Sequence, residues 1–383
     1  MLHKLNTRNG RVAKGLFRTV CLFVFVFQIG GNTAYSQSAD TLNYQQVHFF
    51  KLNQANDLFT VLFQSDKYYT DGIDMELAHS IFNNKVADAV LLGFKKSPYK
   101  DFSLSLNQDI YTPKNTSLTD VDSTDRPYAG QLFMVYAKYS NQFWKAKKIV
   151  SSVYMGVQGP AAFAKEVQNG VHKLISNKEV MGWDNQLSNG LILDYQLQYL
   201  QLIPVSSPIT ELHYFGTARV GALNNLAEAG LRFKIGRYTD TYMNFFGIYN
   251  PRYQQSFTAI DVQKMSSNRR KMIPKRLRNK SFEQQAIFLN QKISRKFQLY
   301  LYTELKGTYW LRDGSVQGSL IQFSPNKYEL KYYDYEHFVV GGRYGVVLQY
   351  ARFFMEYSRY ITTDKYTNNG FFGYGRLILS WAF

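Results

Sequence analysis

Apolar and polar residues alternate one by one along many segments of this chain. In one segment, Leu299, Leu301 and Leu305 alternate with Glu304 and Lys306. The same alternation recurs in three other segments, 73–78, 102–107 and 227–235. Successive side chains of a β-strand point to opposite faces, so a period of two predicts strands with one apolar and one polar face. The chain is therefore expected to be all-β.

Two architectures fit such strands. In a soluble sandwich the apolar faces meet inside, whereas in a membrane barrel they face lipid and the polar faces line the lumen. Three features favour the barrel. The segments are close to the roughly 10 residues that a tilted strand needs to cross a bilayer. Their polar faces carry charges such as Glu304 and Lys306, and the chain ends on a strand with Leu377, Leu379, Trp381 and Phe383 on one face.

We predict a single transmembrane antiparallel barrel of about 12 strands, an even number as in bacterial single-chain barrels. The expected strands are 48–63, 72–80, 101–111, 129–139, 148–158, 191–202, 210–221, 226–237, 297–311, 337–349, 351–361 and 371–383. Residues 282–293 are expected to be loop or helix, because another strand would break the parity. No segment after the first 36 residues is apolar enough for a transmembrane helix.

The first 36 residues have the pattern of a secretory signal. Five basic residues precede the short apolar stretch 20–27, and Ala34-Tyr35-Ser36 is a small-x-small cleavage site. We predict a signal peptide at 1–36 and an outer-membrane barrel domain at 37–383. The single cysteine, Cys21, lies inside the signal, so the mature chain would have no disulfide.

The formal net charge of +17 falls to +12 once the five charges of the signal are removed. The aromatic, strand-rich pattern argues against nucleic acid, and an anionic lipid surface is the better partner. Eight cations crowd residues 264–280, at the end of the barrel that holds the N-terminus. That run is either a solvated loop or a contact for anionic lipid or another polyanion.

Strand parity places three polar connections, 64–71, 112–128 and 159–190, at the opposite, outer end. Their motifs are Asn56-Asp57 with 68–72, Gln108-Asp109-Ile110-Tyr111 with 125–130, and 159–187. In the last motif, Pro160 suits the start of a helix. An apolar stripe of Phe163, Val167, Val171 and Leu174 predicts a short helix with one face against the barrel. Gln168 and His172, four apart, share another face.

These residue types indicate hydrolytic chemistry. His172 could act as a general base near neutral pH. Asn56, Asp57 and Thr70 offer the oxygen ligands that calcium prefers, and a cation there could polarise an ester carbonyl. The chain has neither zinc-ligand spacing nor a G-x-S-x-G nucleophile elbow.

Together these motifs resemble the LpxR family of outer-membrane lipid A 3'-O-deacylases. The resemblance is strongest from Asn56 to Gln186 and thin over 240–296. It implies a twelve-stranded barrel and a carboxylic ester hydrolase that uses Ca²⁺ to release the 3'-acyloxyacyl group of lipid A, a component of lipopolysaccharide.

Carried over by position, the resemblance implies catalytic roles for Asn56, Asp57, Thr70 and His172. The family acid that follows the histidine falls at Lys178, and Glu179 beside it would join Asn56, Asp57 and Thr70 as a calcium ligand. Arg126 and Gln168 are the expected substrate-binding residues, Arg126 holding lipid A phosphate or pairing with Asp125 or a lumen acid. We expect a monomer among outer-membrane lipids. The alternatives are a non-catalytic barrel, either a porin or a structural protein, and a phospholipase-like barrel with another lipid substrate.

Overall fold

The computed structural model describes residues 48–56, 68–95, 97, 99–123, 125–174, 176, 178–205, 207, 209–239, 241–242, 257–293, 295–366 and 370–383. The predicted signal peptide lies outside these residues, as do Asp57 and the rest of the predicted first strand up to residue 63.

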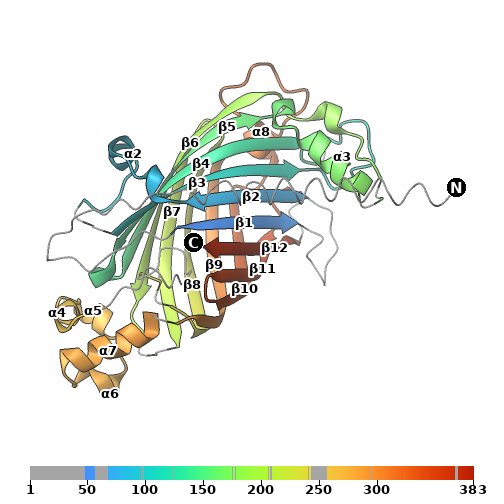
Figure 1. Ribbon diagram of the computed structural model, residues 1–383. Coiled ribbons are helices and arrows are strands. Elements are labelled where there is room, and N and C mark those ends of the chain that lie inside the picture. The colour runs from blue at the N-terminus through green and yellow to red at the C-terminus, as the bar shows by residue number, and fades with distance from the viewer. Residues whose placement is uncertain are drawn as a thin grey trace. The chain divides into compact units, whose positions relative to one another are not determined.

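Twelve antiparallel strands form a closed barrel in which every strand pairs with its neighbours in sequence, and β1 pairs with β12 (Figure 1). The strands are β1 Phe49–Asn56, β2 Asp71–Ala78, β3 Tyr99–Tyr111, β4 Ala129–Gln142, β5 Lys147–Gln158, β6 Gly190–Ile203, β7 Thr210–Gly221, β8 Asn224–Arg237, β9 Phe297–Asp313, β10 Phe338–Tyr350, β11 Phe353–Thr363 and β12 Phe371–Ala382. Each predicted strand is present, so the predicted architecture and strand number are confirmed.

The alternation of residue types matches the two faces of the wall. On the inward face, Glu304 accepts from Arg232 at 2.6 Å across the β8–β9 pair. On the outward face, Leu301 and Leu305 are 57% and 61% exposed. Apolar residues outside and charges inside are what a membrane barrel requires, because lipid offers no partner for a charge.

The first and last strands close the barrel at a seam. Phe49 of β1 lies opposite Ala382 of β12. The backbone N–H of Phe383 donates to the carbonyl of His48 at 3.1 Å. The barrel end that holds His48 and Phe383 is called the inner end below, and the opposite end is the outer end.

Short helices occupy the connections at both ends (Figure 1). The inner end carries η2 Ser80–Phe82, α2 Lys85–Val90, η3 Phe143–Lys145, α4 Ala259–Gln263, α5 Ser267–Arg270, α6 Lys275–Arg278 and α7 Phe282–Ile293. The outer end carries η4 Pro160–Ala162, α3 Ala164–Leu174, η5 Trp183–Asn185, α8 Gly314–Gln317 and η6 Tyr332–Asp334. Helix α7 therefore occupies the segment expected to be loop or helix. None of the helices in the described part of the chain is both long and apolar enough to span a membrane.

The chain that follows β8 turns into the lumen at the inner end. Tyr238 is fully buried. The Thr241 hydroxyl donates to Glu211 at 2.6 Å, and the Lys148 ammonium donates to the Thr241 carbonyl at 3.1 Å. Tyr242 lies 3.0 Å from a ring nitrogen of His213. Part of the lumen is thus filled by side chains and backbone at this end.

Candidate functional site

A carboxylate and an amide meet on the outward face of the wall, at the outer end. Asn56, the last residue of β1, lies directly opposite Asp71, the first residue of β2. The Asn56 amide donates to a carboxylate oxygen of Asp71 at 3.2 Å. Alternation puts both on the same side of the wall as Met75, which is 41% exposed. The pair is therefore outside the lumen, although Asp71 itself is buried.

Thr70 stands beside this pair. Its hydroxyl is 2.8 Å from the hydroxyl of Thr112, and its backbone N–H donates to the Ile110 carbonyl at 3.1 Å. The structure thus gathers the predicted residues Asn56 and Thr70 at one stretch of rim and adds Asp71. Strand register alone reveals Asp71, because it decides which residue of β2 faces Asn56. No three His, Cys, Asp or Glu side chains gather as a metal-binding group within the described part of the chain.

Helix α3 packs against the outward face of β3 and β4. Ala164 fits over Gly130, where a Cβ atom would lie 2.4 Å from that of Ala164. The Gln108 amide donates to the Ala162 carbonyl at 2.6 Å. Ala164 also shares a buried cluster with Ile110. Since Ile110 lies opposite Asp71 in the sheet, α3 and the Asn56–Asp71 pair flank the same residue.

The predicted orientation of α3 is wrong for three of the four residues of the apolar stripe. Pro160 begins the short 3₁₀ helix η4, as predicted, and the α-helix α3 follows from Ala164. Of the predicted apolar stripe, Phe163, Val171 and Leu174 are 59%, 42% and 63% exposed. The buried residues of α3 are Ala164 and Gln168, and Val167 of the stripe packs against the buried cluster that contains Ala164.

Gln168 is one of the buried residues of α3. Its side-chain amide oxygen accepts a hydrogen bond of 2.8 Å from the indole N–H of Trp183. The Trp183 side chain is itself fully buried. This contact fixes the segment that follows α3 beneath the helix. Gln168 therefore does not share an exposed face with His172, and its substrate-binding role remains a prediction.

His172 lies near the end of α3 and is partly exposed. Its Nδ1 atom is 2.5 Å from the backbone carbonyl oxygen of Lys178. Asn169 lies three residues earlier on the helix. Its side-chain amide nitrogen donates to Glu179 at 3.3 Å, and its side-chain amide oxygen accepts from the Val180 N–H at 3.0 Å. These bonds fold the segment after α3 back along the helix, so that His172, Lys178 and Glu179 come together.

Arg126 lies inside the outer end of the barrel. Its guanidinium donates to the carbonyls of Tyr68 and Ser315 at 3.1 and 2.9 Å and stacks 4.5 Å over the Tyr111 ring. It forms no ion pair with Asp125 among the described residues. These contacts tie three connections together, and the predicted role of Arg126 toward phosphate stays a prediction.

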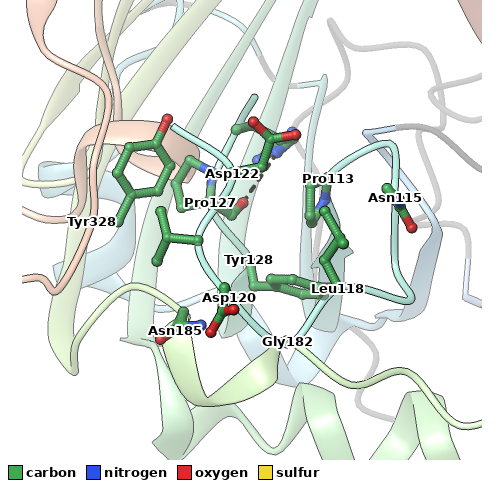
Figure 2. Close-up of a pocket in the computed structure, with 12 residues that line it drawn as sticks. Pro113, Asn115, Leu118, Asp120, Asp122, Pro127, Tyr128, Gly182, Asn185 and Tyr328 are labelled. Carbon is green, nitrogen blue, oxygen red and sulfur yellow. Dashed lines mark hydrogen bonds between the residues drawn. The ribbon is translucent and has the colours of Figure 1, made fainter. Parts of the chain in front are cut away.

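A pocket open to solvent lies at the outer end, lined by the connections that follow β3, β5 and β9. Figure 2 shows its lining, which includes Asp120, Tyr128, Asn185 and Tyr328. The Tyr128 side chain is 5% exposed, yet its hydroxyl has no hydrogen-bond partner among the described residues. Burial, with the nearby Asp125 carboxylate, raises the pKa of Tyr128 to about 12. The hydroxyl therefore remains a neutral donor at physiological pH.

Similarity to solved structures is low in sequence and extends over most of each chain. LpxR from Salmonella typhimurium is 15% identical, with a TM-score of 0.60 over 88% of this chain and 100% of that one. The β domain of the Bordetella autotransporter BrkA is 9% identical, with a TM-score of 0.38 over 88% and 100% of the two chains. The translocator domain of the autotransporter NalP from Neisseria meningitidis is 9% identical, with a TM-score of 0.35 over 99% and 98%.

The Salmonella structure shares the fold, whereas TM-scores below 0.5 support no inference about this chain. No curated protein sequence gives a significant match. The model of one family, described as outer membrane protein LpxR, matches residues 19–383. That match spans nearly the whole sequence and all twelve strands. The chain therefore belongs to the LpxR family of outer-membrane proteins.

Proposed function

We propose that this protein is a calcium-dependent hydrolase that removes the 3'-acyloxyacyl group of lipid A in the outer leaflet. The observation that carries the proposal is the position of the Asn56–Asp71 pair and α3. Both lie on the outward face of the wall at the outer end. A lipid could reach such a site from the side without leaving its leaflet, because the site does not open into the lumen.

His172 is the proposed general base. A bond from Nδ1–H to the Lys178 carbonyl selects the tautomer in which Nε2 carries the lone pair. Nε2 can then take a proton from a water molecule that attacks the ester carbonyl, and the protonated imidazole can return that proton to the departing alcohol oxygen. The Lys178 carbonyl would hold the ring in place through both steps. Its side chain has no part in this mechanism.

The oxygen donors at the rim fit calcium. Asn56, Thr70 and Asp71 offer an amide, a hydroxyl and a carboxylate, the hard ligands that this cation prefers. The proposed ligands are Asn56, Asp57 and Thr70, with Glu179 from the segment after α3, and Asp71 is added from its contact with Asn56. Calcium bound there would polarise the ester carbonyl and stabilise the developing oxyanion.

The alternatives differ in what they require of the barrel. A porin needs an open lumen. The contacts of Thr241 with Glu211 and of Tyr242 with His213 fill part of the lumen and so disfavour a porin. A phospholipase-like enzyme could use the same chemistry on another ester, because the choice of lipid depends on the shape of the pocket and not on the fold.

The test is mass spectrometry of lipid A after incubation with the purified barrel. Hexa-acylated lipid A in detergent would be treated with calcium in one sample and with a chelator in the other. Loss of the 3'-acyloxyacyl mass only with calcium is expected. Intact lipid A in both samples, from a barrel whose electrophoretic mobility changes on heating, would contradict the proposal. Cleavage of glycerophospholipid in place of lipid A would support the phospholipase-like alternative.

A further inference from the structure

Residues 257–293 form a small helical cap at the inner end, made of α4, α5, α6 and α7 (Figure 1). Its core holds Phe257, Val262, Met272 and Leu289, and that core continues into Phe143 at the β4–β5 turn. The backbone N–H of Ser266 donates to the Trp144 carbonyl of the same turn at 3.2 Å. The cap is therefore fixed to the barrel where the strands leave the bilayer.

The cap carries far more positive than negative charge. It contains nine Lys and Arg residues and two acidic ones, Asp261 and Glu283, a net charge of +7. Asp261 caps helix α4 by accepting from the backbone N–H of Thr258 at 2.8 Å. One of the two carboxylates therefore serves the fold of the cap itself.

Three arginines of the cap are used in its own packing. Arg269 stacks 4.5 Å over the Phe143 ring. Arg270 donates to the Gln263 carbonyl at 2.9 Å, and Arg278 donates to the Ile273 carbonyl at 2.8 Å. These guanidiniums hold the helices together, and removing them would disturb the fold.

Five other cations are exposed, and none has a carboxylate within ion-pair distance among the described residues. They are Lys264, Lys271, Lys275, Arg276 and Lys280. Exposed apolar side chains accompany them: Ile260 on α4 is 61% exposed, and Ile287 on α7 is 58% exposed. Cations together with exposed aliphatic groups are typical of surfaces that rest at a membrane interface.

A second feature, a segment with exposed apolar side chains on the outward wall, favours lipid beside this end of the barrel. Residues 79–95, called the arm, lie on the outward wall of the barrel. There Lys138, on the same face as Met134, donates to the Leu91 carbonyl at 2.8 Å and pairs with Asp88 at 2.6 Å. The arm covers these polar groups and turns Ile81 and Val86, 72% and 74% exposed, away from the wall.

The arm and the cap both attach near the inner end of β4, the arm at Ser140 and the cap at Phe143. Ser97, just past the arm, donates to the carbonyl of Asn141. The Asn141 amide in turn donates at 3.2 Å to the carbonyl of Tyr242, whose ring belongs to the core shared with the cap. The cationic cap and a segment with exposed apolar side chains thus attach to the same end of β4.

We propose that the five exposed cations of the cap bind the phosphates of anionic phospholipids in the leaflet at the inner end, with Ile260 and Ile287 resting among the upper acyl carbons. Ammonium and guanidinium groups near an anionic leaflet are attracted to its surface. The exposed apolar side chains of the arm and of the cap, together with the positive charge of the cap, favour a phospholipid over a soluble polyanion. This surface is independent of the hydrolytic site proposed at the outer end.

The test is native mass spectrometry of the whole barrel in neutral detergent with equal phosphatidylglycerol and phosphatidylethanolamine. The cap variant is K264Q/K271Q/K275Q/R276Q/K280Q, and the matched control is K114Q/K165Q/K173Q/K327Q/K331Q at the outer end. Wild type and control are expected to retain phosphatidylglycerol in preference, and the cap variant to retain at least about five-fold less. Should the full variant fail to fold, the pair K275Q/R276Q is expected to show a smaller loss in the same direction.

Two results would overturn the proposal. One is undiminished phosphatidylglycerol on the cap variants, or an equal loss on the control, since either removes the cap as the binding surface. The other comes from sedimentation of the barrel with isolated cell-wall sacculi. If the cap variants lose sacculus binding and keep phospholipid binding, the partner is the anionic cell-wall polymer.

Discussion

The Nδ1 atom of His172 lies 2.5 Å from the carbonyl oxygen of Lys178. A backbone carbonyl thus occupies the place where a carboxylate orients the catalytic imidazole in many hydrolases. The contact is made by the backbone of Lys178 and does not depend on the chemistry of its side chain. It suggests how a lysine can be accommodated at a position where the family resemblance implies an acid.

Two substitutions distinguish the contribution of the His172 ring to the rate from that of the Lys178 side chain. H172A is expected to lower the rate of 3'-acyloxyacyl release by at least about 100-fold, because a positioned general base contributes that much or more. K178A keeps the carbonyl and should stay within about two-fold of wild type. Rates would be followed by mass spectrometry of lipid A under saturating calcium. Equal rates for H172A and wild type would remove the imidazole from the mechanism.

Asn56 and Asp71 are expected to control calcium affinity. In D71N or N56A the oxygen donor set loses a charge or a ligand, so the calcium concentration for half-maximal activity should rise about ten-fold or more. D184N is the matched control, because Asp184 is an exposed outer-end carboxylate paired with Lys165. A calcium titration of lipid A cleavage measures the effect. Unchanged titration curves for both variants would place the cation elsewhere.

The twelve strands could be predicted because their signal is local. Each strand alternates residue by residue, so boundaries such as 210–221 for β7 follow from the sequence. The pairing of Asn56 with Asp71 could not be predicted, because register depends on the connection between β1 and β2. The apolar stripe on α3 did not identify the face that packs on the barrel wall, for another reason. In a membrane protein, apolar side chains face lipid as well as the protein core, so Phe163 and Leu174 do not show which side of the helix packs on the wall.

The contact between Gln168 and Trp183 predicts a structural effect. Q168L leaves the buried indole N–H without an acceptor, which should lower the free energy of unfolding by about 1–3 kcal/mol. Urea unfolding monitored by tryptophan fluorescence would measure it. V171S is the control, because Val171 is exposed on the same helix and surface changes usually stay within about 0.5 kcal/mol. Full stability of Q168L combined with weakened lipid A binding would instead support the substrate-binding role.

The seam at the inner end should make the barrel sensitive to mild acid. Burial, together with the neighbouring His79, lowers the pKa of His48 to about 4. The rings of His48 and His79 stack at 4.1 Å, and the Ser80 N–H points at His48 Nε2 from 3.4 Å, a contact that requires that nitrogen unprotonated. The folded protein therefore keeps His48 neutral where the unfolded chain, with an ordinary histidine pKa of about 6.5, takes up a proton.

Because the unfolded state binds more protons between the two pKa values, the free energy of unfolding should fall as pH decreases from about 6.5 toward 4. Above pH 6.5 both states are neutral at His48 and the contribution is constant. H48Q removes the titrating ring and should flatten the decline between pH 6.5 and 5, before most carboxylates titrate. Urea unfolding at pH 7.5, 6.0 and 5.0 measures the slope, and an identical slope in H48Q and wild type would show that the seam histidine does not control it.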